Sequence, residues 1–430
     1  MNILILNLPE WEVTQIDEDE DDYVITARPS SSLSICPFCG YDTLYKHGDL
    51  EQHIRDVPSH GKRVLIQVTR QRYRCKHCTK TSFETLPDID EKRFCTKRLI
   101  TFLQRRSMND DRTFLSLAEE TGLHEKTVRR IFHDYVLELE RSTHFATPRI
   151  MGMDELHVIH QPRAIITNIE RNTVVEFLAD RKKQTIIRYL SSVPDREHIA
   201  LVCIDMWQPY REAVREVLPH AIIVIDKFHA VKLANQAMEV VRKEVRASLT
   251  EKQRRTLIHD RFLLLKRESE LKEKERLTLE AWTGSFPTLK KAYDLKEAFY
   301  EIWDAPDKDE AHQRYFAWQE QITPEVTSAF TPIALTVEEW GDEIFAYFDH
   351  RITNAYTESL NGLARVANRL GRGYSFQVLR ARLLYGIGQH RRRKAKVSNV
   401  ESDSEGVALS TLEQSVLDSG LETKNTVEAE

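Results

Sequence analysis

Short apolar segments alternate with amphipathic ones through the middle of the chain. Apolar residues recur at every second position, or run together, where a strand is predicted, and every three to four positions where a helix is predicted. In chain order the segments are strands at 150–158, 163–170 and 173–179, a helix at 183–192, a strand at 199–205, a helix at 210–218 and a strand at 221–226. The pattern predicts an α/β domain built on one sheet.

The pattern changes after the last of these strands. Residues 230–340 are rich in Lys, Glu, Leu and aromatic residues and show no strand pattern, so we expect them to be helical. The order β-β-β-α-β-α-β is that of a ribonuclease H-like fold, in which the first and fourth strands are neighbours at the centre of the sheet. The helical stretch then interrupts that fold as an insertion before its last helices.

Three acidic residues lie in unlike settings. Asp154 is in the first predicted strand, Asp205 closes an apolar run, and Glu358 is in a helix-like stretch near the end of the chain. Hard divalent cations such as Mg²⁺ prefer oxygen ligands and take few from the protein, so three carboxylates suit a pair of such ions. The chain has 67 acidic residues, so a triad is easily assembled by chance. Asp226, at the end of another predicted strand, is a rival ligand.

A pair of predicted helices precedes the sheet. Within the helical segment 96–144, residues 114–132 have the helix-turn-helix pattern: Ala118 where the helices cross, Gly122 in the turn, and Val128 and Ile131 on the buried side. The second helix would present to DNA the residues His124, Glu125, Lys126, Arg129 and Arg130. An amphipathic helical hairpin with a glycine turn shares this pattern and remains the alternative.

Four of the six cysteines form two pairs, Cys36-Pro-Phe-Cys39 and Cys75-Lys-His-Cys78. Thiolates two residues apart can face one ion, so the pairs predict a tetrahedral structural zinc site, with disulfides as the alternative. Between the pairs lie two alternating runs, 53–57 and 63–70, which predict a hairpin.

Composition limits the class of protein. A chain of 430 residues is longer than a domain with a single hydrophobic core usually is, so we expect two to four domains. No apolar run approaches the roughly 18 residues of a membrane span. No secretory signal opens the chain either, so we expect a cytoplasmic protein.

The net charge of −5 conceals a segregation of charge along the chain. Residues 1–30 and 401–430 each carry eight acidic residues against one basic, so the body between them is basic. The stretch 361–396 contains ten Lys or Arg and no Asp or Glu. A solvated helix face normally mixes signs, so this stretch favours contact with phosphates, and the candidates are Arg365, Arg369 and Arg372. We expect double-stranded DNA as the partner.

Several motifs are spread over the chain: Cys36-Pro-Phe-Cys39-Gly40, Arg72-Tyr-Arg-Cys75, Asp205-Met-Trp-Gln-Pro-Tyr210, Asp226-Lys-Phe-His229, and Arg351-Ile-Thr-Asn354 with Glu358-Ser-Leu-Asn361. In these motifs the chain resembles DDE transposases of bacterial insertion sequences, specifically the insertion-sequence L-three (ISL-three) family. The resemblance covers about residues 34–395. Cys75 and Cys78 are closer together than the corresponding residues of many relatives.

The resemblance implies both the activity and the residues that carry it. The family's catalytic carboxylates fall on Asp154, Asp205 and Glu358, which would bind Mg²⁺ or Mn²⁺, and its zinc ligands fall on Cys36, Cys39, Cys75 and Cys78. Such a protein binds the terminal inverted repeats of its insertion sequence, and it cleaves and transfers DNA strands by a two-metal mechanism. We expect it to act as a homodimer.

The expected architecture is a multidomain α/β protein. In chain order it has an acidic N-terminal segment (1–33), a zinc-binding β domain (34–90), a helix-turn-helix domain (95–145), the first part of a ribonuclease H-like catalytic domain (148–232), an all-helical insertion (233–340), the last, basic helices of the catalytic domain (341–396) and a disordered acidic tail (397–430).

Two other functions stay open on the sequence alone. A DNA-binding transcriptional regulator could use the zinc domain and the helix-turn-helix with a decayed catalytic domain, although the presence of all three carboxylates argues against decay. A ribonuclease H-like nuclease or resolvase would cleave DNA without strand transfer. A strand-transfer assay with and without a target plasmid separates the three functions.

Overall fold

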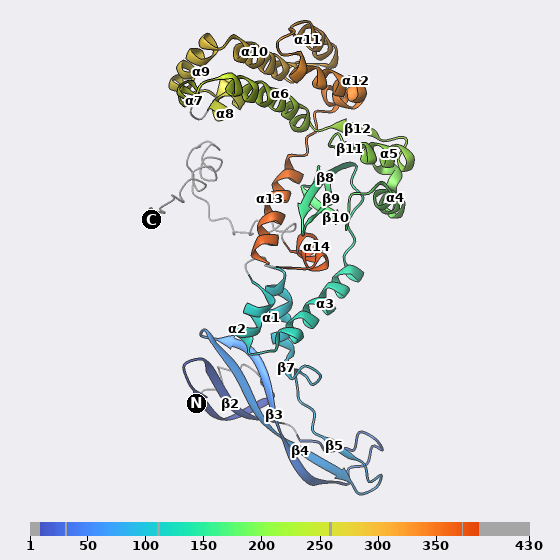
Figure 1. Cartoon of the computed structure of the whole chain (residues 1–430). Coiled ribbons are helices and arrows are strands. Elements are labelled where there is room, and N and C mark those ends of the chain that lie inside the picture. Colours follow the sequence, from blue (N-terminus) through green and yellow to red (C-terminus); the bar gives the residue numbers. More distant parts are fainter. Residues whose placement is uncertain (1–8, 31, 110–111, 258–259, 372, 387–430) are drawn as a thin grey trace, which may run out of the picture. The chain divides into compact units, whose positions relative to one another are not determined.

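The computed structural model describes residues 9–30, 32–109, 112–257, 260–371 and 373–386. Among these residues the strands form two sheets, and in sequence the helices lie between the sheets, among the strands of the second sheet and after it (Figure 1). None of the helices in this part of the chain is long and apolar enough to cross a membrane.

The first sheet carries the two cysteine pairs. Its strands are β1 (Trp11–Glu18), β2 (Asp22–Pro29), β3 (Leu44–Ser59), β4 (Lys62–Cys75), β5 (Thr81–Phe83), β6 (Ile89–Asp90) and β7 (Cys95–Thr96). β3 and β4 form the predicted antiparallel hairpin, and alternate residues Val64, Ile66 and Val68 of β4 enter the core. The acidic N-terminal segment supplies β1 and β2, and β2 runs parallel to β4.

Three helices follow, α1 (Lys97–Ser107), α2 (Phe114–Thr121) and α3 (Glu125–Ser142). Ala118, Val128 and Ile131 are buried between them, as the sequence pattern predicts. Gly122 ends α2 in the left-handed conformation at φ 70°, and a Cβ there would lie 2.6 Å from the Arg55 guanidinium carbon. This turn therefore favours glycine because of its left-handed backbone conformation, whereas the end of the flexible Arg55 side chain could move away.

The core of these three helices is completed from the far end of the chain. Tyr374 and two residues of α14 (Phe376–Tyr385), Val378 and Ala381, are buried in the same cluster as Phe114 and Leu117 of α2. The Tyr374 hydroxyl donates a hydrogen bond of 3.1 Å to the carbonyl oxygen of Arg112.

The second sheet, called the central sheet below, has the strands β8 (Ile150–Val158), β9 (Gln161–Asn168), β10 (Thr173–Phe177), β11 (Leu201–Ile204) and β12 (Ile222–Ile225) in the order β10-β9-β8-β11-β12. β8, β9 and β10 pair antiparallel, whereas β11 is parallel to both β8 and β12. The first and fourth predicted strands are therefore neighbours, as expected. The connecting helices are α4 (Lys183–Ser192) and α5 (Gln208–Val217).

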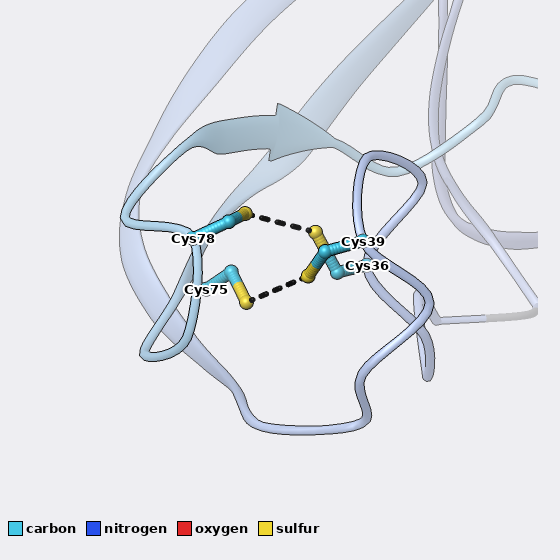
Figure 2. A group of neighbouring side chains, drawn as sticks. All are labelled: Cys36, Cys39, Cys75 and Cys78. Atoms are coloured by element: carbon cyan, nitrogen blue, oxygen red, sulfur yellow. Dashed lines mark hydrogen bonds between the residues drawn. The ribbon is translucent and has the colours of Figure 1, made fainter.

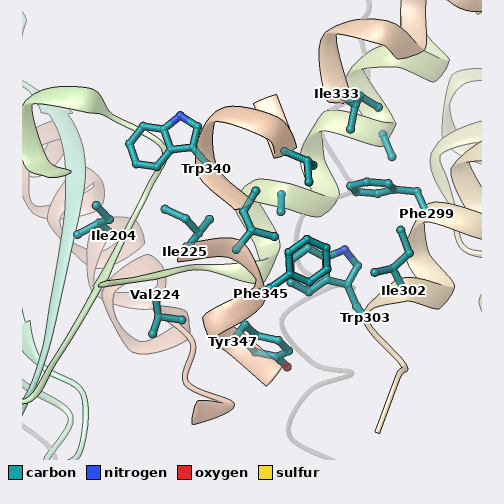
Figure 3. Close-up of a cluster of buried hydrophobic side chains, with 14 of the residues drawn as sticks. Ile204, Val224, Ile225, Phe299, Ile302, Trp303, Ile333, Trp340, Phe345 and Tyr347 are labelled. Carbon is teal, nitrogen blue, oxygen red and sulfur yellow. The ribbon is translucent and has the colours of Figure 1, made fainter. Parts of the chain in front are cut away.

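Between β12 and residue 350 the described residues form helices and no strand, which agrees with the sequence pattern. The helices are α6 (Lys227–Ser248), α7 (Glu251–Thr256), α8 (Asp260–Leu265), α9 (Glu273–Ser285), α10 (Pro287–Ile302), α11 (Lys308–Glu320) and α12 (Thr327–His350). Figure 3 shows Val224 and Ile225 of β12 in one buried cluster with Trp303, Trp340 and Phe345 of the helices. The helices thus share a continuous apolar core with the central sheet.

Alternation along β8 gives the central sheet two different faces. Met151 and Met153 point into the core just described, whereas Leu156 and Val158 pack with α13 (Ala355–Leu370) and α14. Asp154 belongs to the same alternating set as Leu156 and Val158, so α13 lies on the face from which the Asp154 carboxylate projects.

A buried ion pair joins the central sheet's helix α5 to α12. The Arg211 guanidinium donates two hydrogen bonds, of 2.6 and 2.9 Å, to the Glu343 carboxylate, and Arg215 donates a third of 2.6 Å. The Arg211 guanidinium carbon also lies 4.5 Å from the centre of the Trp340 ring. Because the Glu343 side chain is only 5% exposed, its loss would leave Arg211 buried without a counter-charge.

We predict that Glu343→Gln destabilises the fold by about 3–5 kcal/mol, the usual cost of removing one partner of a buried ion pair. Equilibrium urea unfolding followed by tryptophan fluorescence measures it. The matched control is Glu339→Gln, one turn earlier on α12, because that side chain is exposed and only its carbonyl oxygen binds Arg211. Equal unfolding midpoints for the two variants would contradict the prediction.

Candidate functional site

The four cysteines of the two pairs come together at one end of the β3–β4 hairpin (Figure 2). The sulfur of Cys36 lies 3.6 Å from that of Cys78, and the sulfur of Cys39 lies 3.6 Å from that of Cys75. The backbone N–H of Gly40 closes the first turn onto the Cys36 carbonyl at 2.9 Å. The four thiols are therefore arranged as one group, which suits a tetrahedral ion better than two separate disulfides.

The local backbone favours the thiolate form of Cys75, whereas burial and the neighbouring thiols raise the pKa of Cys39 to about 12. The N–H of Cys78 is the main cause that lowers the pKa of Cys75 to about 6, and the N–H of His77 acts in the same direction. Zinc binds the thiolate form of cysteine, so a lowered pKa favours metal binding near neutral pH. The His77 ring stacks on Tyr41 with ring centres 3.9 Å apart, and it stands outside the group of four sulfurs.

A second cluster of possible ligands lies at the central sheet. β11 aligns Cys203 with Gly152 of β8, and continuing this register brings Asp205 level with Asp154. Ligand atoms of Asp154, Asp205 and His229 all lie within 4.8 Å of one another. The parallel pairing of two neighbouring strands thus places both predicted aspartates in one group.

Glu358 belongs to an overlapping group. It lies in the first turn of α13, and its carboxylate, Asp226 and His229 have ligand atoms within 4.8 Å of one another. His229 is common to both groups, so it links the three predicted carboxylates. Asp226, the rival ligand predicted from the sequence, lies in the second group, and the structure adds His229 to the possible ligands.

Hydrogen bonds from α13 fasten this helix to the two aspartate strands. The Asn354 side-chain amide donates to the carbonyl oxygens of Met153 on β8, at 3.1 Å, and of Cys203 on β11, at 3.5 Å. Thr357 donates to the Asn354 side-chain oxygen at 2.9 Å. One turn beyond Glu358, the Asn361 amide donates to Oδ2 of Asp154 at 2.7 Å.

Gly152 permits the helix to approach this closely. A Cβ at residue 152 would lie 2.3 Å from Asn354 Oδ1 and 2.6 Å from Thr167 Oγ1, so no larger residue fits there without displacing α13. The sequence motifs contained Asn354 and Asn361, but no pattern indicated their role, because their partners are backbone groups and a carboxylate about 150 to 207 residues away.

Burial disfavours the charged form of the carboxylates in this cluster. It raises the pKa of Asp205 to about 6 and shifts the pKa of Asp154 and that of Glu358 upward. Burial lowers the pKa of His229, but the neighbouring carboxylates of Asp226, Asp154 and Asp205 outweigh it and raise that pKa above its ordinary value. The cluster therefore has a deficit of positive charge that a divalent cation would supply.

Two carboxylate oxygens in the cluster lack a hydrogen-bond partner among the described residues, Oδ1 of Asp205 and Oδ2 of Asp226. Unpaired buried carboxylate oxygens are costly, and they are the atoms that Mg²⁺ or Mn²⁺ binds. The residues therefore fit the expected divalent ions.

An aromatic ring lies beside the cluster. The Arg181 guanidinium carbon stands 3.9 Å from the centre of the Trp207 ring, and Arg181 also forms an ion pair with Glu155. In the structure Arg181 covers one face of the ring.

The three basic residues predicted to contact DNA, Lys126, Arg129 and Arg130, are all exposed on α3. The Arg129 guanidinium also binds Glu125 at 2.6 and 2.9 Å and lies 4.9 Å from the Phe114 ring centre. His124 caps the helix, since its Nδ1 accepts from the N–H of Lys126 at 3.1 Å.

The basic stretch 361–396 is used in two ways. Arg365 and Arg369 are exposed on α13, and Arg372 lies outside the described residues. Arg380 instead binds Glu176 and Glu140, and Arg382 is fully buried, with a hydrogen bond of 2.8 Å to the Arg112 carbonyl. Arg380 and Arg382 therefore pair inside the fold, and a one-sign run cannot show which of its members do so. The phosphate contacts predicted for Arg365, Arg369 and Arg372 stay a prediction.

Comparisons with known proteins match the same three parts of the chain. A family model described as a transposase matches residues 151–383. A zinc-finger model of transposases IS204/IS1001/IS1096/IS1165 matches residues 32–78, and a model described as the helix-turn-helix domain of transposase family ISL3 matches residues 84–136.

Relatives with curated names are transposases too. The transposase for insertion sequence element IS1001 of Bordetella parapertussis is 23% identical over 387 residues, which span 87% of this chain and 95% of that protein. The transposase for insertion sequence element IS1557 of Mycobacterium tuberculosis is 24% identical over 294 residues, which span 61% of this chain and 65% of that protein.

We predict that Cys36→Ser or Cys75→Ser lowers the zinc content of the purified chain from about one equivalent to near zero. Each variant lacks one thiolate, and in such sites the binding free energy is also folding free energy, so protease should cut residues 34–80 more readily. Elemental analysis and limited proteolysis measure both effects. Cys95→Ala is the control, since Cys95 is a buried thiol outside the cluster. Full zinc occupancy in both serine variants would exclude this site.

Proposed function

The chain belongs to the ISL3 family of transposases, and we propose that it binds the terminal inverted repeats of its insertion sequence and catalyses metal-dependent DNA cleavage and strand transfer. The observation that carries the proposal is the meeting of Asp154, Asp205 and Glu358 around His229, from two strands and a helix about 150 residues further along the chain.

The proposed metal ligands are Asp154, Asp205 and Glu358. Two Mg²⁺ or Mn²⁺ ions bound to such carboxylates would activate the attacking oxygen and stabilise the leaving oxygen of an in-line displacement at phosphorus. The chain's own part is positional: Asn361 orients Asp154, and Asn354 keeps α13 against β8 and β11. The same site would serve both steps, hydrolysis at the element end and attack of the freed 3′-hydroxyl on target DNA.

We further propose that the central sheet is the core of a ribonuclease H-like domain. The order β10-β9-β8-β11-β12, with three antiparallel strands followed by two parallel ones, supports this fold. The all-helical segment between β12 and α13 would then be an insertion, and the ion pair of Arg211 with Glu343 and the shared apolar core would attach it to the sheet.

DNA binding is proposed for the zinc ribbon and the helix-turn-helix. Cys36, Cys39, Cys75 and Cys78 would hold the structural zinc, and Lys126, Arg129 and Arg130 would contact DNA. Arg365 and Arg369 project from α13, the helix that also carries Glu358, so they are proposed to bind phosphates close to the reacting bond. The homodimer, one copy for each element end, stays a prediction.

We predict that Glu358→Gln abolishes cleavage and strand joining, lowering both by several orders of magnitude, while binding of element ends stays normal. Glutamine keeps the size of the side chain but lacks the charge that holds a hard cation. Asp205→Asn should behave alike, and the double variant should be little worse than either single one, because ligands of one site act as a unit.

Cleavage and joining are measured on labelled element ends with and without target plasmid. Asp195→Asn is the control, since this exposed carboxylate lies in the same part of the chain but outside the ligand groups. Near-normal cleavage by Glu358→Gln, with Asp226→Asn inactive, would show that the third carboxylate is Asp226.

We predict that Arg130→Ala weakens binding to element ends more than Arg129→Ala does, because Glu125 already binds Arg129. A lost base contact should cost about 1–3 kcal/mol, whereas a lost phosphate contact should lower the salt slope by about one. Salt-dependent gel-shift titrations distinguish the two. Arg141→Ala, at the far end of α3, is the control. If the double variant of Arg129 and Arg130 binds element ends with wild-type affinity and salt slope, residues 114–132 form only a helical hairpin and not a DNA-binding motif.

A further inference from the structure

Asp226 has one carboxylate oxygen that its structural role does not explain. It follows β12 directly and caps α6, since its Oδ1 accepts from the N–H of Phe228 at 3.3 Å. The residue is 0% exposed, yet its Oδ2 has no hydrogen-bond partner among the described residues. Nδ1 of His229 lies 3.7 Å from that oxygen, which is too long for a hydrogen bond.

Helix capping alone does not require a charge at this position. Asparagine caps helices about as well as aspartate does, and it avoids the cost of burying a carboxylate. A fully buried aspartate with a free oxygen therefore calls for a cation, and a carboxylate oxygen of Asp226 lies within 4.8 Å of ligand atoms of His229 and Glu358.

The spacing of these atoms is that of ligands around one ion. Oxygen ligands on opposite sides of Mg²⁺ stand about 4.2 Å apart, twice a metal–oxygen bond of about 2.1 Å. The ligand atoms of Asp226, His229 and Glu358 lie within 4.8 Å of one another, and so do those of Asp154, Asp205 and His229. Two groups of ligands that share a histidine provide for two ions.

We propose that Asp226 and His229 are metal ligands that, together with Glu358, hold one of the two divalent cations, while Asp154 and Asp205 hold the other. This inference rests on the proposed function and adds two residues to its site. Imidazole is a better ligand for Mn²⁺ and later transition metals than for Mg²⁺, so the ion at Asp226 should be the one with a preference for Mn²⁺.

The test counts bound ions without any reaction. Purified full-length protein that retains its zinc is titrated with Mn²⁺ into the millimolar range, and the electron paramagnetic resonance signal of free Mn²⁺ gives the number bound. We expect two Mn²⁺ per wild-type chain and one per Asp226→Asn chain. His229→Gln should weaken binding of the second ion by at least about tenfold. It should also reduce the preference of that site for Mn²⁺ over Mg²⁺ in competition.

Asparagine at 226 preserves the helix cap, so this variant should fold. Asp307→Asn is the matched control, because Asp307 caps α11 in the same way, with its Oδ1 2.9 Å from the Glu310 nitrogen, and belongs to neither ligand group. It should bind two ions. Circular dichroism and urea unfolding confirm that the variants are folded.

The outcomes separate this inference from the function on which it rests. If Asp226→Asn and His229→Gln bind two ions with wild-type affinity while Asp205→Asn loses one, the added ligands are wrong and the proposed catalytic site stands. If Asp205→Asn also binds two ions, the site itself is misplaced. A wild-type chain that binds a single ion, retained in Asp226→Asn, likewise overturns the inference.

Discussion

Repulsion between like charges is the constraint around which the central sheet is organised. Asp154, Asp205 and Asp226 converge where water is largely excluded, and their mutual repulsion must be offset before any ion is bound. Neutral donors do part of this: the backbone N–H of Glu155 and the Asn361 amide bind the two oxygens of Asp154. Burial is the main cause that raises the pKa of Asp205 to about 6, with the Asp154 charge acting in the same direction, and the surrounding carboxylates raise the pKa of His229. Binding of divalent cations would supply positive charge to this cluster. Part of the free energy of ion binding would therefore come from relief of the repulsion between these carboxylates.

The sequence allowed prediction of the parts of this arrangement that depend on local pattern. Strands such as 150–158 and the hairpin around residue 60 follow from alternation, and the pairing of the first and fourth strands follows from the order of elements. The contacts of Asn354 and Asn361 could not be predicted, because an asparagine that binds distant backbone carbonyls has the same sequence signature as one exposed to solvent. The strands β1 and β2 were missed for a related reason, since their many acidic residues masked the alternation of Ile25 and Ala27.

Charge composition was a poor guide to individual side chains. The ten basic residues between 361 and 396 suggested one function, yet Arg380 and Arg382 are bound within the fold. Arg211 likewise serves structure, since it joins α5 to α12 through Glu343. A run of basic residues shows only that the segment has an excess of positive charge. Tertiary packing decides which group each of these side chains binds, and the run does not indicate that packing.

The contribution of α14 to the helix-turn-helix core bears on how the protein is made. Tyr374, Val378 and Ala381 fill a cluster whose other buried members lie between residues 95 and 132, so this core stays open until the ribosome has passed residue 381. A nascent chain released earlier would expose Phe114 and Leu117 instead of a finished DNA-reading surface. The order of synthesis thus delays completion of the DNA-binding fold until the segments that carry all the proposed catalytic residues have been translated.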